Sequence, residues 1–379
     1  MTLIRHLLMI GLVQSFALIA VVRPALGQED PAPPLVTYDE VKPAMDITAG
    51  DGARVAEIII VVKDAAKSAR RFSDVFGCDW TFYDYRPVVR ATHGKPSSDE
   101  SYLKLALAAC GGRNVRLVQP VSGVSAYAEF LERVGEGFFG ISIGARSDFD
   151  ESVKALTAAG VSIQMISDGG NGLRTAVLDS SADLGLRVEF SGPGATTPPS
   201  LKKTGAYSAT KAPIVDLSEP LGSGGRYIGQ LGLVVDDIHR VSRRYAELLG
   251  LRYWRFTSIL TAAMSNRGIP ISATDMPSTK VGWGATFLGD VQIELLDPVP
   301  GVPGGPHRNF LDKHWPNNGF QHVMLLPGWP AAHREIFTNL FKNGAVNYME
   351  YSMNPGPTDG YYVQLPDVGN IIVEWNIQP

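Results

Sequence analysis

The fold is decided by two stretches that share one pattern, VAEIIIVVKD at residues 55–64 and YIGQLGLVVDD at residues 227–237. Each is an apolar run that contains one polar residue, Glu57 or Gln230, with an aspartate seven residues later. A helical stretch follows each run and ends at a glycine, as expected where a helix closes with a left-handed residue. The repeat therefore predicts a strand followed by a capped helix in both places.

Two further copies of this unit lie between and after these stretches. Their strands are expected at residues 138–143 and 320–326, and their helices close at Gly160 and Gly344. Strand-like runs complete every copy, so the repeating unit is a strand, a helix and about three strands. The runs that close the four units are residues 114–118, 186–190, 291–296 and 371–375.

Length, composition and charge limit the classes of protein that fit. The chain has 379 residues, of which 45% are hydrophobic and 19% are charged, so it can bury more than one core. Its formal net charge is −4 at pH 7 and its pI is near 6.0, which leaves no basic stripe for nucleic acid. We expect a small-molecule partner, no nucleic acid, and a monomer or a homodimer.

Composition shifts divide the chain into five segments. We expect a signal peptide at residues 1–27, a proline-rich extended arm at 28–52 and a first domain at 53–192. A linker rich in Gly, Pro, Ser and Thr is expected at 193–225, followed by a second domain at 226–379.

The first 27 residues are typical of an export signal. Arg5 supplies a positive start, Leu7–Val22 is nearly all apolar, and Ala25–Gly27 offers small residues at the cleavage position. The apolar run is short for a membrane-spanning helix. We therefore expect a periplasmic or secreted protein that is not attached to a membrane after cleavage.

The chain has two cysteines, Cys78 and Cys110. Cys78 precedes one expected strand and Cys110 closes the next, so antiparallel pairing of these strands would bring the two together. An oxidising compartment would allow a disulfide. Two separately buried thiols remain the alternative.

Taken together, the residues resemble a known family. The polar residue seven positions before an aspartate, the helix that ends in Phe-Gly or Leu-Gly, and the closing Ile-Glu-Leu-Leu-Asp-Pro run are similar to the vicinal oxygen chelate (VOC) superfamily, which includes glyoxalase I, methylmalonyl-CoA epimerase, extradiol dioxygenases and bleomycin-resistance proteins. The resemblance covers residues 54–379 apart from the linker. It implies an α+β fold in which four βαβββ modules form two tandem, glyoxalase-like half-barrels.

The resemblance also implies metal ligands on the first and last strands of the paired modules. Carried over position by position, the ligands in the C-terminal barrel are Gln230, Glu294, His322 and Glu374. Such donors suit one divalent ion, which could be Zn, Ni, Co, Mn or Fe. A single histidine in an apolar strand is usually a core residue, but four ligand-capable residues at four inward positions favour a site. We expect His307 and His314 at the surface or in loops.

The N-terminal barrel differs at the same positions. It has Glu57, Arg116, a position near Gly140 or Ile141, and Glu189. Arginine stays protonated and cannot ligate a metal. We therefore expect no metal in this barrel and expect the Arg116 guanidinium to lie between the two glutamates.

By resemblance to glyoxalase I, the C-terminal site suits metal-assisted proton transfer next to a carbonyl of a small oxygenated substrate. This reaction type covers isomerases, epimerases and lyases. Glu374 is the first choice for the base and Glu294 the second. Aromatic residues that could line the substrate pocket are Trp254, Trp283, Tyr351 and Tyr362.

Two alternatives stay open. One is a non-catalytic protein that binds or sequesters small molecules in an aromatic crevice. The other is an Fe(II) dioxygenase, which is disfavoured because Gln230 stands where such an enzyme has a histidine. Export argues against glutathione hemithioacetals, the usual glyoxalase substrates, because these are cytosolic compounds.

We predict that export removes residues 1 to about 27, because the segment has the charged start, apolar stretch and small residues of a cleaved signal. N-terminal sequencing of the protein recovered from an exporting host should find a new start near Gln28. An intact Met1 in the soluble exported fraction would contradict the prediction.

Overall fold

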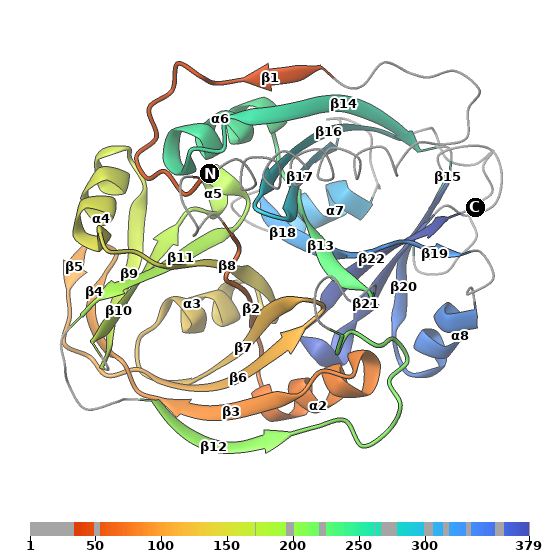
Figure 1. Ribbon diagram of the computed structural model, residues 1–379, viewed down its shortest axis with the longest axis horizontal. Helices are drawn as coiled ribbons and strands as arrows, with labels where there is room; N and C mark the ends of the chain where they lie inside the picture. Colours follow the sequence, from red (N-terminus) through yellow and green to blue (C-terminus); the bar gives the residue numbers. More distant parts are fainter. Residues whose placement is uncertain are drawn as a thin grey trace, which may run out of the picture.

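The computed structural model describes residues 34–48, 54–170, 172–194, 201–219, 225–261, 263–266, 279–298, 306–313, 318–330, 335–352 and 360–378. The predicted signal peptide and His314 lie outside these ranges. The chain folds into two large curved sheets with helices packed between and around them (Figure 1). Among the described helices, none is long and apolar enough to span a membrane.

The N-terminal half contains two modules and an additional strand. The first module consists of β2 (Glu57–Val61), α2 (Ala65–Phe76), β3 (Trp80–Tyr85), β4 (Val88–Thr92), β5 (Lys95–Pro96), β6 (Tyr102–Cys110) and β7 (Arg113–Ser122), and it is followed by α3 (Ala126–Arg133). The second consists of β8 (Gly137–Ala145), α4 (Phe149–Ala158), β9 (Ser162–Gly170), β10 (Leu173–Asp179), α5 (Ser181–Leu184) and β11 (Arg187–Pro193). The additional strand is β12 (Leu201–Tyr207).

The C-terminal half repeats this arrangement. Its first module consists of β13 (Tyr227–Val234), α6 (Ile238–Leu249), β14 (Tyr253–Thr261), β15 (Ala263–Asn266), β16 (Thr279–Leu288) and β17 (Val291–Pro298), and it is followed by α7 (Pro306–Lys313). The last module consists of β18 (Gly319–Leu326), β19 (Trp329–Pro330), α8 (Glu335–Lys342), β20 (Val346–Ser352), β21 (Gly360–Leu365), the 3-10 helix η3 (Pro366–Val368) and β22 (Ile371–Gln378). The remaining strand, β1 (Leu35–Thr37), precedes all four modules.

The two sheets have the same strand order. One runs β12-β3-β6-β7-β2-β8-β11-β10-β9-β4-β5, and the other runs β1-β14-β16-β17-β13-β18-β22-β21-β20-β15, with β19 paired to β22. At the centre of each, the opening strands of two modules pair antiparallel, and each has its own module's closing strand as a parallel neighbour. The predicted fold, α+β with four βαβββ modules paired into two tandem half-barrels, is confirmed.

The seven-residue spacing between the polar strand residue and the aspartate, which both halves share, marks a helix start in each half. Asp64 caps α2 by accepting a hydrogen bond from the Lys67 amide, and Asp237 caps α6 in the same way. Both helices end at a glycine, Gly77 with φ 74° and Gly250 with φ 81°. These positive angles are unfavourable for residues with a side chain, which explains the glycine at the end of each helix.

Each curved sheet also holds a helix that the sequence analysis did not predict. In Figure 1, α3 lies within the curve of the N-terminal sheet and α7 lies within that of the C-terminal sheet. Phe130 of α3 packs on Phe139 of the sheet with ring centroids 5.4 Å apart, and α7 buries Phe310 and Leu311. The helices therefore fill part of each cup from inside.

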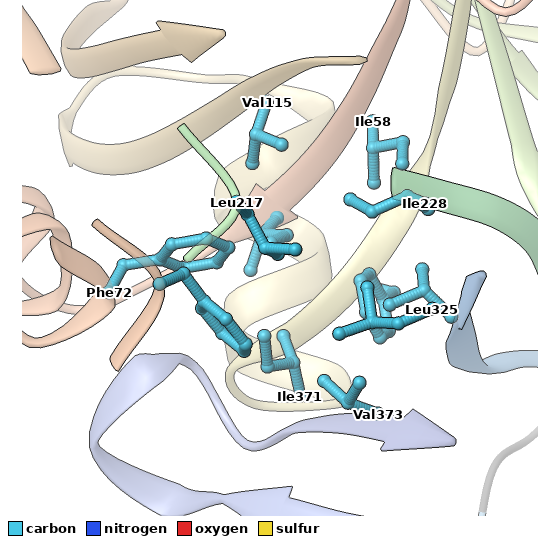
Figure 2. Close-up of a pocket in the computed structure, with 12 residues that line it drawn as sticks. Ile58, Phe72, Val115, Leu217, Ile228, Leu325, Ile371 and Val373 are labelled. Atoms are coloured by element: carbon cyan, nitrogen blue, oxygen red, sulfur yellow. The ribbon is translucent and has the colours of Figure 1, made fainter. Parts of the chain in front are cut away.

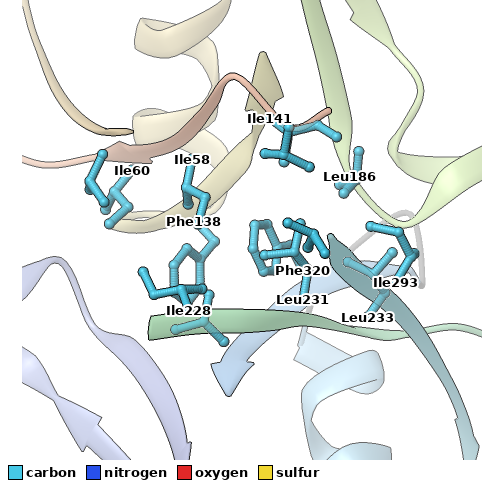
Figure 3. Close-up of a cluster of buried hydrophobic side chains, with 14 of the residues drawn as sticks. Ile58, Ile60, Phe138, Ile141, Leu186, Ile228, Leu231, Leu233, Ile293 and Phe320 are labelled. Atoms are coloured by element: carbon cyan, nitrogen blue, oxygen red, sulfur yellow. The ribbon is translucent and has the colours of Figure 1, made fainter. Parts of the chain in front are cut away.

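The two halves share one hydrophobic core. The rings of Phe138 and Phe320 stack with centroids 4.4 Å apart, and each comes from the central strand pair of its own half. Figure 3 shows Ile58 and Ile228 beside these rings, with further aliphatic residues of both sheets around them. A small cavity in this region is lined by apolar side chains alone, including Phe72 (Figure 2). Because it lacks polar groups, we assign it to packing and not to ligand binding.

The two cysteines are paired. Cys78 and Cys110 form a disulfide, with their Cα atoms 5.4 Å apart. The bond joins the residue after the α2 cap to the end of β6, the arrangement that antiparallel pairing of the two strands would produce.

The predicted arm at the N-terminus attaches to the C-terminal barrel. Strand β1 pairs antiparallel with β14 at the edge of the C-terminal sheet. The amides of Met45 and Ile47 then donate to the carbonyls of Leu248 and Leu249 at the end of α6, at 3.0 and 3.1 Å. Both side chains are buried in the shared core.

The segment predicted as a linker attaches to the N-terminal barrel in the same way. Strand β12 pairs antiparallel with β3, which Figure 1 shows at the bottom of the molecule. The amides of Val215 and Leu217 donate to the carbonyls of Val75 and Phe76 at the end of α2, at 2.8 and 2.9 Å. Each barrel is therefore completed by the segment that precedes the other barrel in the chain.

We predict that the two arms stabilise opposite barrels. Ile47→Ala and Leu217→Ala each remove a buried side chain and should each cost about 2–5 kcal/mol of unfolding free energy. Hydrogen exchange should become faster around the end of α6 and β14 in Ile47→Ala, but around the end of α2 and β3 in Leu217→Ala. Faster hydrogen exchange of α2 and β3 in Ile47→Ala would contradict the assignment of the N-terminal arm to the C-terminal barrel.

Candidate metal centre

Strand register brings the sequence-predicted residues of the C-terminal barrel into two adjacent rows. In one row, Gly232 on β13 pairs with Glu294 on β17 and with His322 on β18. In the next row on the same face, Gln230 on β13 lies opposite Met324, whose other neighbour is Glu374 on β22. Because side chains alternate along a strand, residues two apart on β13 face the same side.

Three of the four predicted residues meet in one cluster. Nε2 of His322 lies 3.1 Å from Oε2 of Glu374 and 3.3 Å from Oε2 of Glu294. One donor atom from each of the three side chains lies within 4.8 Å of the others. Their exposed fractions are 0% for His322, 7% for Glu294 and 6% for Glu374. Within the part of the chain that the structure describes, no residue outside the cluster forms a hydrogen bond with these three buried atoms.

The two carboxylates are held by their other oxygens. Nε1 of Trp283 donates to Oε1 of Glu294 at 2.7 Å, and the Tyr351 hydroxyl donates to Oε1 of Glu374 at 2.9 Å. These bonds fix each carboxylate so that its Oε2 atom faces His322. Trp283 and Tyr351, predicted as pocket residues, thus contact the cluster itself.

The space for the imidazole ring is provided by its neighbours. A Cβ atom at Gly232 would overlap the His322 ring, so any other residue there would displace the ring. Tyr362, also a predicted pocket residue, packs edge-on against the ring with centroids 4.8 Å apart. His322 is therefore confined between a glycine, an aromatic edge and two carboxylates.

The charges of the cluster change the basicity of the histidine. Burial alone would lower the pKa of His322, but the adjacent Glu294 and Glu374 carboxylates raise it to about 9. Without another cation, a proton on His322 balances part of the negative charge of the two glutamates.

Gln230 is buried on the same face of β13, with 3% of its surface exposed. Its place two residues before Gly232 puts it beside the cluster by strand alternation. Its amide oxygen is the neutral donor that it could contribute to a metal.

Two expectations about this barrel were wrong. Trp254 does not belong with the cluster: its ring packs against Tyr245 of α6, with centroids 5.5 Å apart, and its indole N–H donates to the Leu251 carbonyl. It faces the helix side of the sheet, and alternation of apolar residues alone could not tell the two faces apart. His307 is not at the surface, because it lies on α7 with only 5% of its area exposed.

Gln321 links His307 to the cluster and was not predicted from the sequence. Oε1 of Gln321 lies 2.9 Å from Nδ1 of His307 and 3.3 Å from Nδ1 of His322. Burial, with His322 nearby, lowers the pKa of His307 to about 4. A signal was present, since Phe-Leu-acid-base recurs in α3 and α7, at residues 130–133 and 310–313, and this repeat places His307 at the position of Tyr127.

The corresponding cup of the N-terminal barrel holds a positively charged side chain. By register, Arg116 occupies the position of Glu294, and Gly140 the position of His322. Nε of Arg116 lies 2.9 Å from Glu57 and its NH2 atom 2.6 Å from Glu189. The predicted placement of Arg116 between the two glutamates is confirmed.

Neighbouring groups complete this ion pair. The Tyr127 hydroxyl of α3 donates to Oε2 of Glu189. Burial would lower the pKa of Arg116, but the Glu189 and Glu57 carboxylates raise it well above its usual value. The guanidinium is therefore a permanent cation at the centre of the N-terminal cup.

We predict that Arg116→Ala lowers the free energy of unfolding by about 3–5 kcal/mol, because it leaves the buried Glu189 carboxylate without its cation. Chemical denaturation should show a lower midpoint than in the wild type. Lys67→Ala is the control, since Lys67 and Asp367 are 71% and 58% exposed and such pairs contribute about 0–1 kcal/mol. An unchanged midpoint in Arg116→Ala would show that the ion pair does not stabilise the fold.

Comparison with protein-family models and with curated proteins finds no match. Among solved structures, the chain is similar to a variant of 4-hydroxymandelate synthase from Streptomyces coelicolor, with 12% identity, a TM-score of 0.48, and 86% of this chain and 93% of that chain covered. A halotolerant catechol dioxygenase is similar at 13% identity and a TM-score of 0.37, with 88% of each chain covered. A variant of Streptomyces coelicolor methylmalonyl-CoA epimerase is similar at 20% identity and a TM-score of 0.26, covering 38% of this chain and 98% of that chain.

The topology of the chain identifies its fold. Four modules of one strand, one helix and further strands pair two by two, with the opening strands side by side at the centre of each sheet. The first and last strands of each pair carry the buried polar residues, on the inner face of each cup. The chain therefore has the vicinal oxygen chelate fold, present as two tandem half-barrels.

Proposed function

We propose that this chain is a metal-dependent enzyme of the glyoxalase-like VOC type, which transfers a proton next to a carbonyl of a small oxygenated substrate. Such a reaction belongs to an isomerase, an epimerase or a lyase. The proposal places the reaction in the C-terminal cup, at Glu294, His322 and Glu374, with Gln230 as the fourth ligand.

One observation carries the proposal: three buried ligand atoms, from two carboxylates and an imidazole, face one another, and no other described residue forms a hydrogen bond with them. Buried polar atoms normally have partners, since leaving one without a partner costs about 1–3 kcal/mol, and more for charged groups. At the corresponding place the N-terminal cup has a guanidinium. The C-terminal cup has two carboxylates and an imidazole there, a donor set that fits a divalent cation.

The donor set also limits which cation suits the site. An imidazole nitrogen and carboxylate oxygens, with an amide oxygen from Gln230, fit Zn, Ni, Co, Mn or Fe. The chemistry that such an ion supplies when bound is the polarisation of a substrate carbonyl. Gln230, Glu294, His322 and Glu374 would hold it.

Proton transfer is assigned to the carboxylates. Glu374 is the first candidate for the base, because its Oε1 is held by the Tyr351 hydroxyl while its Oε2 faces the centre of the cup. Glu294 is the second, since the Trp283 indole holds it in the same manner. A base with one fixed oxygen keeps the other oxygen in a constant position, which favours proton transfer over a short distance.

We predict one divalent ion per chain, measured by elemental analysis after incubation of the full-length protein with Zn, Ni, Co, Mn or Fe(II). His322→Ala should lose the ion, because it removes the imidazole ligand. Glu374→Gln should keep an oxygen donor but no base. It should therefore retain metal while exchanging the proton next to the carbonyl about 10²–10⁴-fold more slowly.

The exchange is followed by proton NMR in D₂O with a panel of small α-hydroxycarbonyl compounds, since proton transfer next to a carbonyl replaces that proton by deuterium. Glu57→Gln is the matched control, because Glu57 is the N-terminal counterpart of Gln230. It should leave the metal content at one ion per chain. If the wild type gains no metal, the enzyme proposal fails and a non-catalytic binding protein takes its place.

We further propose that the protein acts in the periplasm or after secretion. The signal-like start of the sequence supports this location. The Cys78–Cys110 disulfide also supports it, since disulfides persist mainly in oxidising compartments.

A further inference from the structure

Gln321 is a buried polar residue whose role the metal site alone does not explain. It is the extra residue of a β-bulge: Gly232 pairs with His322, and the next residue, Leu233, pairs with Phe320. A bulge can re-aim a side chain relative to the sheet. Here it brings the Gln321 amide to the ring of His322, although the two residues are adjacent in the strand.

The Gln321 oxygen contacts two imidazoles at once. It lies 2.9 Å from Nδ1 of His307 and 3.3 Å from Nδ1 of His322. An amide oxygen has two lone pairs and can accept two hydrogen bonds, while each neutral imidazole has one N–H to donate. The contacts are satisfied when both rings carry a proton on Nδ1. Nε2 of His322 is then the nitrogen that faces the two carboxylates, and its proton would leave when a metal binds there.

The N-terminal barrel has an apolar version of this contact. Phe139 is the unpaired residue of the equivalent bulge on β8, and its ring centroid lies 4.9 Å from that of Tyr127. Tyr127 is the second residue of α3, as His307 is the second residue of α7. The contact between bulge and inner helix therefore occurs in both barrels. It is polar in the barrel with the His322 cluster and aromatic in the barrel with Arg116.

We propose that Gln321 and His307 are positioning residues for His322. Gln321 fixes the orientation and the tautomer of the His322 ring, and His307 fixes the Gln321 amide. This inference rests on the proposed metal site, where a lone pair on Nε2 is needed. Hydrogen-bond partners on the far nitrogen orient metal-binding histidines, and losing them typically costs about 10–100-fold in metal affinity or activity.

The test compares two substitutions of Gln321 in the full-length, metal-stripped protein by calorimetric titration with Zn²⁺. Gln321→Met keeps the length of the side chain but removes the acceptor, so zinc should bind about 10–100-fold more weakly. Gln321→Glu keeps an acceptor oxygen at the same reach and should restore most of the affinity. Phe139→Met, at the equivalent bulge of the other barrel, is the matched control and should leave the zinc affinity unchanged.

A second measurement reads the hydrogen bonds without any metal. In nitrogen-15 spectra of histidine-labelled protein, the protected Nδ1–H signals of His307 and His322 should be present in the wild type and in Gln321→Glu, but lost in Gln321→Met. Signals that survive in Gln321→Met, or an unchanged zinc affinity, would overturn the proposal. If the wild type binds no zinc, the proposed metal site fails, and the Nδ1–H signals alone then decide whether Gln321 positions His322.

Discussion

Two carboxylates that face each other inside a buried cup need a positive charge between them, and the two halves of the molecule provide it in different ways. In the N-terminal cup, the guanidinium of Arg116 contacts Glu57 and Glu189 at 2.9 and 2.6 Å. In the C-terminal cup, Glu294 and Glu374 face the imidazole of His322, which gains a proton readily because the carboxylates raise its pKa to about 9. If a divalent cation binds as proposed, it replaces that proton, because a metal-binding histidine must be neutral. The N-terminal cup therefore has a permanent cation, whereas the positive charge in the C-terminal cup is on a histidine and depends on pH.

The backbone keeps these charges in place. Side chains change face with every residue along a strand, so a slip of one residue between strands would remove a glutamate from the cup. The same strand order in both sheets and the equivalent registers of their central strands show that one frame is used twice. The two halves are joined by a shared core around Phe138 and Phe320, and the N-terminal arm crosses to the C-terminal sheet. Neither barrel is therefore complete without chain segments that precede the other barrel.

The sequence predicts the parts of this arrangement that depend on local patterns. Alternation and the recurring capped helix were sufficient for the modules, whereas the resemblance to a known superfamily was needed to place Glu294 on an inward-facing strand position. They failed where the outcome depends on which face of a strand is covered, as for Trp254, which packs on α6. They also missed Gln321, because a bulge breaks the alternation on which the prediction relies. The burial of His307 was not predicted for a third reason. The helix that carries it, α7, is short, and this helix is buried only because it lies inside the curved sheet. The attachment of the N-terminal arm to the C-terminal barrel rests on contacts between segments that are distant in the chain, so no local pattern predicts it.

The differences between the two cups are linked, and this linkage argues that the C-terminal cup is specialised. Exchanging Arg116 for a glutamate alone would leave buried carboxylates without a cation, which is strongly destabilising. A histidine at the position of Gly140 needs room across the sheet, and Gly232 provides that room in the C-terminal barrel, where the N-terminal barrel has Ile59. The new ring then needs a partner for Nδ1, which Gln321 supplies from the bulge. Charge, space and hydrogen bonding thus differ together between the barrels. A change at any one of these positions alone would leave a buried charge, a steric overlap or an unpaired N–H.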